Sequence, residues 1–197
     1  MREQTSYLDT THLRELVIWA KEKTFKSNSL FLIESLAPLI LGVKPSELLN
    51  VSLQEEEDWK KFKSLFLKNK ELQIEEIRKL NGRLQVIFFQ RKVLDSVLRE
   101  KPIQDFLATM SYPQRYSLET YIYLLKQRII THDFPHEVGV FLGYPLKDVL
   151  GFMGLLSLPY QRTQGWRIYG DETISNEVYE KYVQARCMMR KIAGDID

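Results

Sequence analysis

The chain has 197 residues, of which 44% are hydrophobic and 12% aromatic, so it is long and apolar enough to fold around a core of its own. Its 28 lysines and arginines against 26 aspartates and glutamates give a net charge of +2, which provides no general attraction to nucleic acids or anionic membranes. The single cysteine, Cys187, excludes an internal disulfide and any metal site with several thiolate ligands, and this suits a reducing cytoplasm.

The N-terminal stretch MREQTSYLDTTHLRELVIWAKEK places charged residues among its apolar ones, so it lacks the uninterrupted apolar run that secretion requires. The longest apolar stretch, LAPLILGV, is much shorter than the roughly 20 residues that cross a bilayer. These patterns predict a soluble, cytoplasmic protein without a membrane as partner.

Helical spacing of apolar residues predicts two N-terminal helices, the first ending near Phe25 and the second stopped by Gly42. Residues 48–53 then alternate as a half-buried strand does. The stretch EEEDWKKFKSLFLKNK begins with acidic residues and continues with lysines, the order that a helix dipole favours, and its aromatic stripe makes Trp59 a core residue.

The pair Asn81-Gly82 predicts a β-hairpin, because a type I′ turn needs positive φ at both central residues. The near-continuous apolar run RLQVIFF after this turn predicts a central strand that is covered on both faces. A further short strand is predicted in GWRIYGD. The strands expected in one small antiparallel or mixed sheet, three or four in number, are 48–53, 72–80, 83–90 and 165–170.

From Lys92 onward the helical period returns, through segments opened by Pro102 and capped by Ser117, up to the amphipathic helix SNEVYEKYVQARCMMRKI. Cys187 lies beside two methionines there and is interpreted as a small core residue. The sequence therefore predicts an α+β fold in which about seven to eight helices pack on the small sheet. Residues 1–197 are expected to form a single domain, within which 92–160 could form a helical sub-region.

The segment HDFPHEVGVFLGYPLKDVLGFM, residues 132–153, predicts two short helices joined by a tight turn. Pro135 and Pro145 suit the first turn of a helix, and Gly143 suits the end of the first helix. The small residues Gly139 and Gly143 also have the spacing found in a helix-turn-helix pair.

The second of these helices, PLKDVLGFM, is a poor candidate for reading DNA. Its charged side chains are Lys147 and the opposing Asp148, whereas contacts to bases and phosphates require several cations and polar groups. No basic patch accompanies the motif, and this argues against a nucleic acid as partner. The helix is expected to be buried or covered by a partner.

His132 and His136 are four residues apart, the spacing at which one helix face presents two imidazoles to a metal. Pro135 places the helix start between them, and in that interpretation Asp133 caps the helix, His136 bonds to local backbone and Glu137 is stabilised by the helix dipole. Two interpretations therefore stay open: a capped helix start, or a small carboxylate–imidazole site that could bind a metal or a haem.

The segment GWRIYGD adds aromatic and guanidinium planes that could stack on a flat ligand. Strand alternation would put Trp166 and Ile168 on one face and Arg167 and Tyr169 on the other. The simpler interpretation is that one of these faces belongs to the core. The candidates for ligand binding are His132, Asp133, His136, Glu137, Tyr144, Trp166, Arg167 and Tyr169, with His132 and His136 as candidates for a metal.

The run FPHEVGVFLGYPLKDVLGFM, followed by GWRIYGD and a final helix with Tyr and Cys, resembles an uncharacterised bacterial family, the domain-of-unknown-function family numbered 3793. LAPLILGVKPSELLNV resembles the opening segment of that family, so the likeness covers most of the chain. The resemblance implies a cytoplasmic bacterial protein and supplies no activity, substrate or catalytic residue. Family members often carry more cysteines near GWRIYGD than this chain, whose LLSLPYQRTQ has none, and this weakens a thiol-based site.

The first functional hypothesis is a non-enzymatic binding or adaptor protein that acts through residues 134–160. A long apolar stretch with few charges motivates it, and the partner would be another protein or a second copy of the chain. The hypothesis fails if four apolar residues of this stretch are wholly buried within the chain, namely Leu146, Leu150, Phe152 and Met153.

The second hypothesis is a protein, enzymatic or not, that binds a small ligand, a metal or a haem. It uses His132, His136 and Glu137, with the aromatic and arginine side chains of GWRIYGD nearby. This hypothesis predicts a pocket at the place where the two segments meet.

Overall fold

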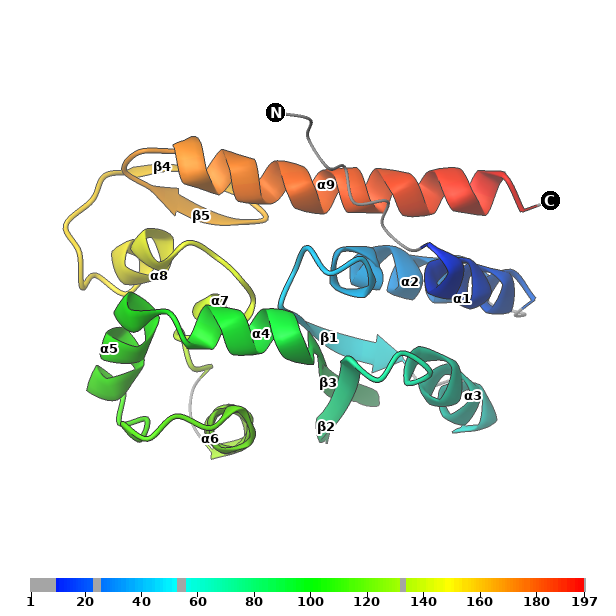
Figure 1. Cartoon of the computed structure of the whole chain (residues 1–197), viewed down its shortest axis with the longest axis horizontal. Coiled ribbons are helices and arrows are strands. Elements are labelled where there is room, and N and C mark those ends of the chain that lie inside the picture. Colours follow the sequence, from blue (N-terminus) through cyan, green and yellow to red (C-terminus); the bar gives the residue numbers. More distant parts are fainter. Residues whose placement is uncertain (1–9, 23–25, 53–55, 132–133, 197) are drawn as a thin grey trace, which may run out of the picture.

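The computed structural model describes residues 10–22, 26–52, 56–131 and 134–196. The chain combines helices with two small antiparallel sheets (Figure 1), and this confirms the predicted α+β class. The nine helices of the described residues are α1 (Thr11–Lys21), α2 (Lys26–Ile40), α3 (Glu56–Phe66), α4 (Arg91–Leu98), α5 (Lys101–Thr109), α6 (Leu118–Thr131), α7 (Val138–Phe141), α8 (Leu146–Phe152) and α9 (Thr173–Gly194). The strands are β1 (Ser46–Ser52), β2 (Leu72–Leu80), β3 (Arg83–Gln90), β4 (Tyr160–Gln164) and β5 (Trp166–Tyr169).

The main sheet has three antiparallel strands in the order β1-β3-β2. The turn between β2 and β3 has φ of 49° at Asn81 and 73° at Gly82, so both central residues adopt the positive φ that the Asn-Gly pair predicts. Six consecutive residues of β3, from Leu84 to Phe89, are buried. The predicted hairpin and central strand are confirmed.

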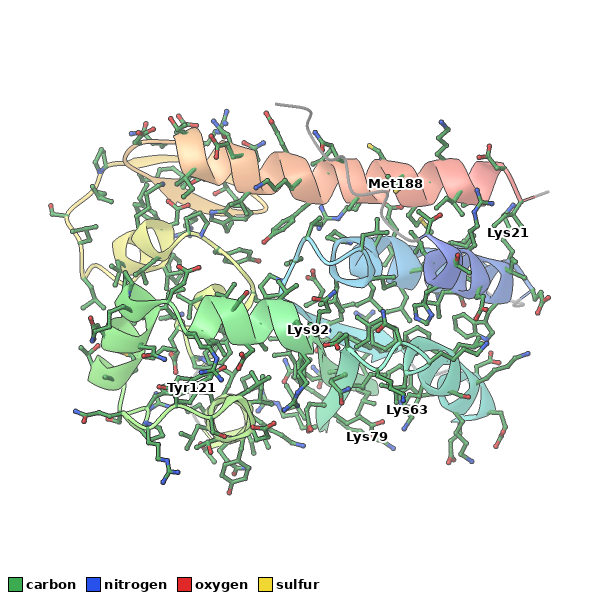
Figure 2. The ribbon with its side chains drawn as sticks, in the orientation of Figure 1. Lys21, Lys63, Lys79, Lys92, Tyr121 and Met188 are labelled. Atoms are coloured by element: carbon green, nitrogen blue, oxygen red, sulfur yellow. The ribbon has the colours of Figure 1, made fainter. Side chains whose placement is uncertain are left out.

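Alternating side chains of β3 divide the interior into two hydrophobic clusters. Val86 and Phe88 belong to the first cluster, which also takes buried residues from α1, α2, α3 and α9. Ile87 and Phe89 belong to the second cluster, with buried residues from α4 to α8, among them the fully enclosed Tyr121 of α6 (Figure 2). Helices therefore cover both faces of the sheet, and this explains the continuous apolar run of β3.

An aromatic group on α3 and β3 forms the centre of the first cluster. Trp59 is only 6% exposed and stacks on Phe62 with a ring-centroid distance of 5.4 Å, while Phe88 meets Phe66 edge-on at 5.5 Å. The indole Nε1 of Trp59 donates to Oε1 of Glu76 at 2.8 Å. The interpretation of Trp59 as a core residue is confirmed.

The fourth predicted strand is present but does not join the main sheet. β5 pairs antiparallel with β4 in a separate two-stranded sheet, and Gly165 makes the turn between them with φ of 76°. Because one residue joins β4 to β5, closing the turn costs little conformational entropy. β5 therefore pairs with β4 rather than with the three-stranded sheet. The sequence of β4, YQRTQ, gave no strand signal because its side chains are polar and mostly exposed.

Helix α9 lies along the other elements and connects the β4–β5 hairpin with α1 and α2 (Figure 1). Its buried stripe includes Tyr182, Ala185, Met189 and Ile192. The interpretation of Cys187 as a core residue is wrong, because that position points away from this stripe and is exposed. No helix in the described part of the chain, α9 included, combines the length and the apolar character needed to cross a membrane.

Candidate ligand-binding pocket

The first of the two predicted short helices is shorter than the sequence indicates. α7 begins at Val138, and no side chain caps its N-terminus in the described residues, while His136 and Glu137 form a turn before it. Glu137 directly precedes α7 and also pairs with Arg128 of α6, whose Nη1 lies 3.1 Å from Oε1 of the buried carboxylate. His132 and Asp133, the predicted cap included, lie outside the described residues.

Two glycines allow α7 and α8 to pack closely. A Cβ on Gly139 would come within 2.8 Å of a methyl group of Val149, so only glycine lets the helices approach this far. Gly143, in the turn, has φ of 77°, and a Cβ there would lie 2.6 Å from both Pro45 and the hydroxyl of Tyr182. The same hydroxyl donates to the carbonyl oxygen of Gly143 at 3.1 Å.

A buried carboxylate, Asp148, joins α8 to β5 and α9. Its Oδ2 accepts from Nε1 of Trp166 at 2.8 Å and from the hydroxyl of Ser175 at 2.6 Å. Its Oδ1 accepts from the backbone N–H of Tyr169 at 2.9 Å and from Nζ of Lys147 at 2.7 Å. Asp148 is 1% exposed, so four donors replace the water that it loses on folding.

The environment of Asp148 keeps it ionised. Burial raises the pKa of this carboxyl, but the hydrogen bonds from Lys147, Ser175, Tyr169 and Trp166 outweigh that effect and leave the pKa below its ordinary value. Lys147 is itself anchored, because its Nζ also donates to the Tyr169 carbonyl and to the Ser175 hydroxyl, both at 2.9 Å. The network is therefore a rigid junction between three elements.

Two stacked aromatic rings form a wall beside this junction. Tyr144 and Trp166 have ring centroids 4.7 Å apart and an interplanar angle of 18°. Burial raises the pKa of the Tyr144 hydroxyl to about 12. The ammonium of Lys44 lies 5.7 Å from the Tyr144 ring centroid, and burial lowers its pKa against the opposing effect of Glu47.

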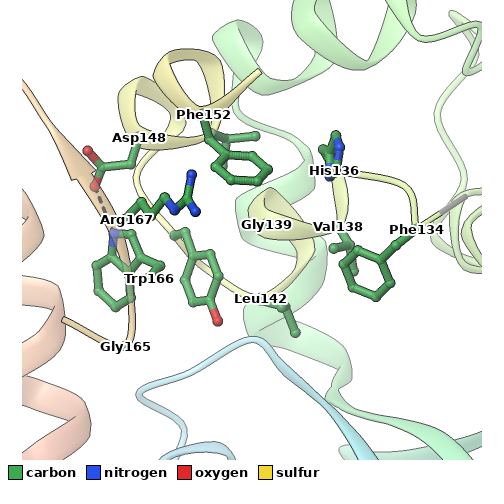
Figure 3. Close-up of a pocket in the computed structure, with 12 residues that line it drawn as sticks. Phe134, His136, Val138, Gly139, Leu142, Asp148, Phe152, Gly165, Trp166 and Arg167 are labelled. Atoms are coloured by element: carbon green, nitrogen blue, oxygen red, sulfur yellow. Dashed lines mark hydrogen bonds between the residues drawn. The ribbon is translucent and has the colours of Figure 1, made fainter. Parts of the chain in front are cut away.

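Between α7, α8 and β5 lies a pocket of about 350 Å³ (Figure 3). Its walls are mainly apolar and aromatic, and Asp148 contributes through the hydrogen bond to Trp166 that Figure 3 marks. The lining residues are Phe134, His136, Val138, Gly139, Leu142, Tyr144, Asp148, Val149, Phe152, Gly165, Trp166 and Arg167.

Four side chains of the pocket lining are exposed to solvent and mark its opening: Phe134, His136, Phe152 and Arg167. Phe152 is 41% exposed, and the imidazole of His136 meets it edge-on at a centroid distance of 5.0 Å. The guanidinium carbon of Arg167 lies 5.4 Å from the centroid of the same ring. The ring of Phe152 thus contacts both polar groups at the opening, the imidazole of His136 and the guanidinium of Arg167.

The structure brings four of the eight candidate residues into one pocket: His136, Tyr144, Trp166 and Arg167. The pocket lies where the segment 134–152 meets 165–167, as the ligand hypothesis expects. Of the other described candidates, Glu137 pairs with Arg128, and Tyr169 packs against Gly151 outside the lining.

Metal binding stays a prediction. It depends on His136 and on His132, which lies outside the described residues. Among the described residues no group of three or more His, Cys, Asp or Glu side chains could hold a metal ion. Binding of a haem likewise stays a prediction, with His136 as its candidate residue in the pocket.

Sequence reasoning missed the part that Asp148 plays. In the sequence, Lys147 and Asp148 serve only as evidence against DNA contacts, although both belong to a helix that is expected to be buried. A charged pair in such a helix requires buried partners, and this was the available signal. The partners themselves are 18 to 28 residues away along the chain, so no local pattern identifies them.

A family model described as "Protein of unknown function (DUF3793)" matches residues 32–195. The chain belongs to this family. The match covers most of the chain and includes all described residues of the pocket, so the pocket lies within the family domain. No curated protein and no solved structure matches the chain.

Proposed function

We propose that this DUF3793 chain is a non-enzymatic binding protein whose pocket takes a small molecule that contains a ring. The observation that supports it is the aromatic wall of a pocket of about 350 Å³. Pockets for small organic ligands have volumes of about 300–1,000 Å³, are mostly apolar and carry few polar groups. A flat ring could pack against Trp166 or Phe152 with the geometry that aromatic pairs prefer.

The walls are fixed without a ligand. Asp148 holds the indole of Trp166, and the contact between Gly139 and Val149 sets the distance between α7 and α8. A ligand would therefore pay little conformational entropy for ordering the protein. The partly exposed ring of Phe152 leaves apolar surface that a ligand would remove from water.

The geometry of Asp148 suits support of the pocket wall rather than acid–base chemistry. A catalytic carboxylate needs room to exchange a proton with its substrate. Asp148 accepts four hydrogen bonds from the protein, and its pKa is held below the ordinary value. It therefore supports the pocket wall as an acceptor.

A second candidate function is an adaptor that contacts another protein through the rim of the pocket. The four apolar residues whose complete burial would contradict this hypothesis are not wholly buried, since Phe152 is 41% exposed and the other three are half-buried. After Phe152 along the chain, three more apolar or aromatic side chains are exposed and form, with it, the apolar rim: Leu155 (55%), Leu156 (42%) and Tyr160 (54%). This apolar rim supports a partner with an apolar surface of its own.

Nuclear magnetic resonance on the ¹⁵N-labelled chain would test the pocket. We would titrate with 2-naphthamide, a neutral probe with two fused rings, and follow the indole N–H signals of the three tryptophans. Trp166→Phe assigns the pocket signal, while Trp19 and Trp59 are buried in the first cluster and serve as internal controls. We expect a saturable shift of the Trp166 signal alone.

Two variants separate the pocket from the apolar rim. Phe152→Ala removes one wall and should weaken binding of the probe. Leu155→Ala removes a more exposed apolar side chain outside the lining and should leave binding unchanged. Absence of any shift at Trp166 would contradict a ligand pocket. An equal loss of probe affinity in both variants would instead place the binding surface on the apolar rim and favour the adaptor function.

A further inference from the structure

One cation at the pocket opening has no acidic partner among the residues that the structure describes. We infer that the natural ligand carries a carboxylate next to its ring and that Arg167 binds this carboxylate. This inference rests on the proposed function and adds the chemical class of the ligand, an anionic ring compound.

The two arginines of the β4–β5 hairpin differ in their surroundings. Arg162 of β4 is neutralised, because its Nε lies 2.9 Å from Glu172 and its Nη2 donates to Asn176 at 2.7 Å. For the guanidinium of Arg167 the described residues provide no ion pair and no hydrogen bond, and it lies over the ring of Phe152. Its five N–H donors are therefore directed to solvent or to a ligand.

The carboxylate that lines the same pocket does not balance this charge. Asp148 is saturated by its four donors, and its charge is already matched by the ammonium of Lys147. The two other groups of the lining that could titrate bring no negative charge at neutral pH. The imidazole of His136 is neutral or positive, and burial raises the pKa of the Tyr144 hydroxyl to about 12. The pocket therefore presents an excess of positive charge to whatever enters it.

The chemistry of a guanidinium selects the kind of anion. Its planar fork donates two parallel N–H bonds to the two oxygens of a carboxylate, and apolar walls strengthen such a bond by lowering the local dielectric constant. In the same pocket the aromatic side chains of Tyr144, Trp166 and Phe152 form apolar lining that a ring can contact. A flat ring that carries a carboxylate matches both features at once.

The test compares two probes of nearly the same shape. 2-Naphthoate has a carboxylate where 2-naphthamide has a neutral amide, so the ratio of their dissociation constants measures the effect of the charge. We expect 2-naphthoate to bind the wild-type chain about tenfold more tightly, the low end for a charge-assisted pair because Arg167 is exposed. The shift of the Trp166 indole signal gives both constants.

Arg167→Gln and Arg162→Gln form a matched pair of variants on the same hairpin. Arg167→Gln should remove the preference for 2-naphthoate, so that the ratio of the two dissociation constants falls from about ten to about one. Arg162→Gln should keep the preference, because Arg162 is outside the lining and already paired.

The outcomes distinguish the two proposals. Equal affinity of both probes for the wild-type chain, or a preference that survives in Arg167→Gln, overturns the inference and leaves the ligand pocket standing. Loss of the preference for 2-naphthoate in both variants also overturns the inference, because the net charge of the chain would then explain the preference. Failure of both probes to shift Trp166 overturns the proposed function together with the inference.

Discussion

Replacing Asp148 by alanine should be one of the most damaging single changes in the chain. The variant leaves the buried indole N–H of Trp166 and the backbone N–H of Tyr169 without their acceptor. Each stranded donor costs about 1–3 kcal/mol. The ammonium of Lys147 keeps two further acceptors, the Tyr169 carbonyl and the Ser175 hydroxyl, so losing Asp148 costs it less free energy than it costs the two N–H donors. We therefore expect the free energy of unfolding to fall by about 3–5 kcal/mol, the range for removing one partner of a buried ion pair.

Urea unfolding followed by circular dichroism would measure this loss at neutral pH. Asp148→Asn keeps the shape and one acceptor oxygen but turns an NH₂ group toward the remaining donors, and about half of the loss is expected. Asp105→Ala is the control, since Asp105 is 61% exposed in an ion pair with Lys101 and should cost less than about 0.5 kcal/mol. A loss below about 1 kcal/mol for Asp148→Ala would refute the view that the network holds α8, β5 and α9 together.

Two further predictions follow from the same geometry. Because the pKa of Asp148 is below its ordinary value in the folded chain, its stabilising contribution is complete above the unfolded-state pKa of about 3.9 and is lost as the pH falls toward the folded pKa. The difference in urea midpoint between wild type and Asp148→Asn should therefore shrink from about pH 6 to about pH 3, and a constant difference would contradict this cause. Gly82→Ala should cost about 1 kcal/mol, because its φ is positive but nothing lies within 4 Å of the added Cβ. Gly143→Ala has a similar φ and in addition places the Cβ 2.6 Å from neighbouring atoms, so urea unfolding should show at least about 1 kcal/mol more, and equal losses would contradict the packing argument.

The main sheet was predictable because its signals are local. Asn81 and Gly82 adopt the two positive φ angles that the pair predicts, and the apolar run beginning at Leu84 reflects burial on both faces. Trp59 stands in a stripe whose helical period matches its burial in the first cluster. In each case the responsible physical effect acts over a few residues.

The pocket was predictable only in part, because its parts depend on contacts between distant segments. Four of the eight candidates meet there, since the α7–α8 turn and the β5 strand were both recognised as elements rich in aromatic and polar side chains. The sequence predicts a role for Glu137 at the helix start, whereas in the structure its buried carboxylate pairs with Arg128 of another helix. The hairpin of β4 and β5 was missed because its first strand has no apolar alternation, and the turn at Gly165 alone does not predict pairing.

Trp166 connects the stability of the fold with the shape of the pocket. Its ring is part of the pocket wall, while its indole N–H is one of the four donors to Asp148, a residue that also holds α9 through Ser175. Such a wall cannot move without breaking a buried hydrogen bond, so a ligand of the proposed kind would have to fit the pocket as it stands. Adjustment is left to the exposed side chains at the opening, and Arg167 is the one whose charge is free to meet a ligand. Shape selection by the buried wall and charge selection at the opening would thus act through different residues of the same strand.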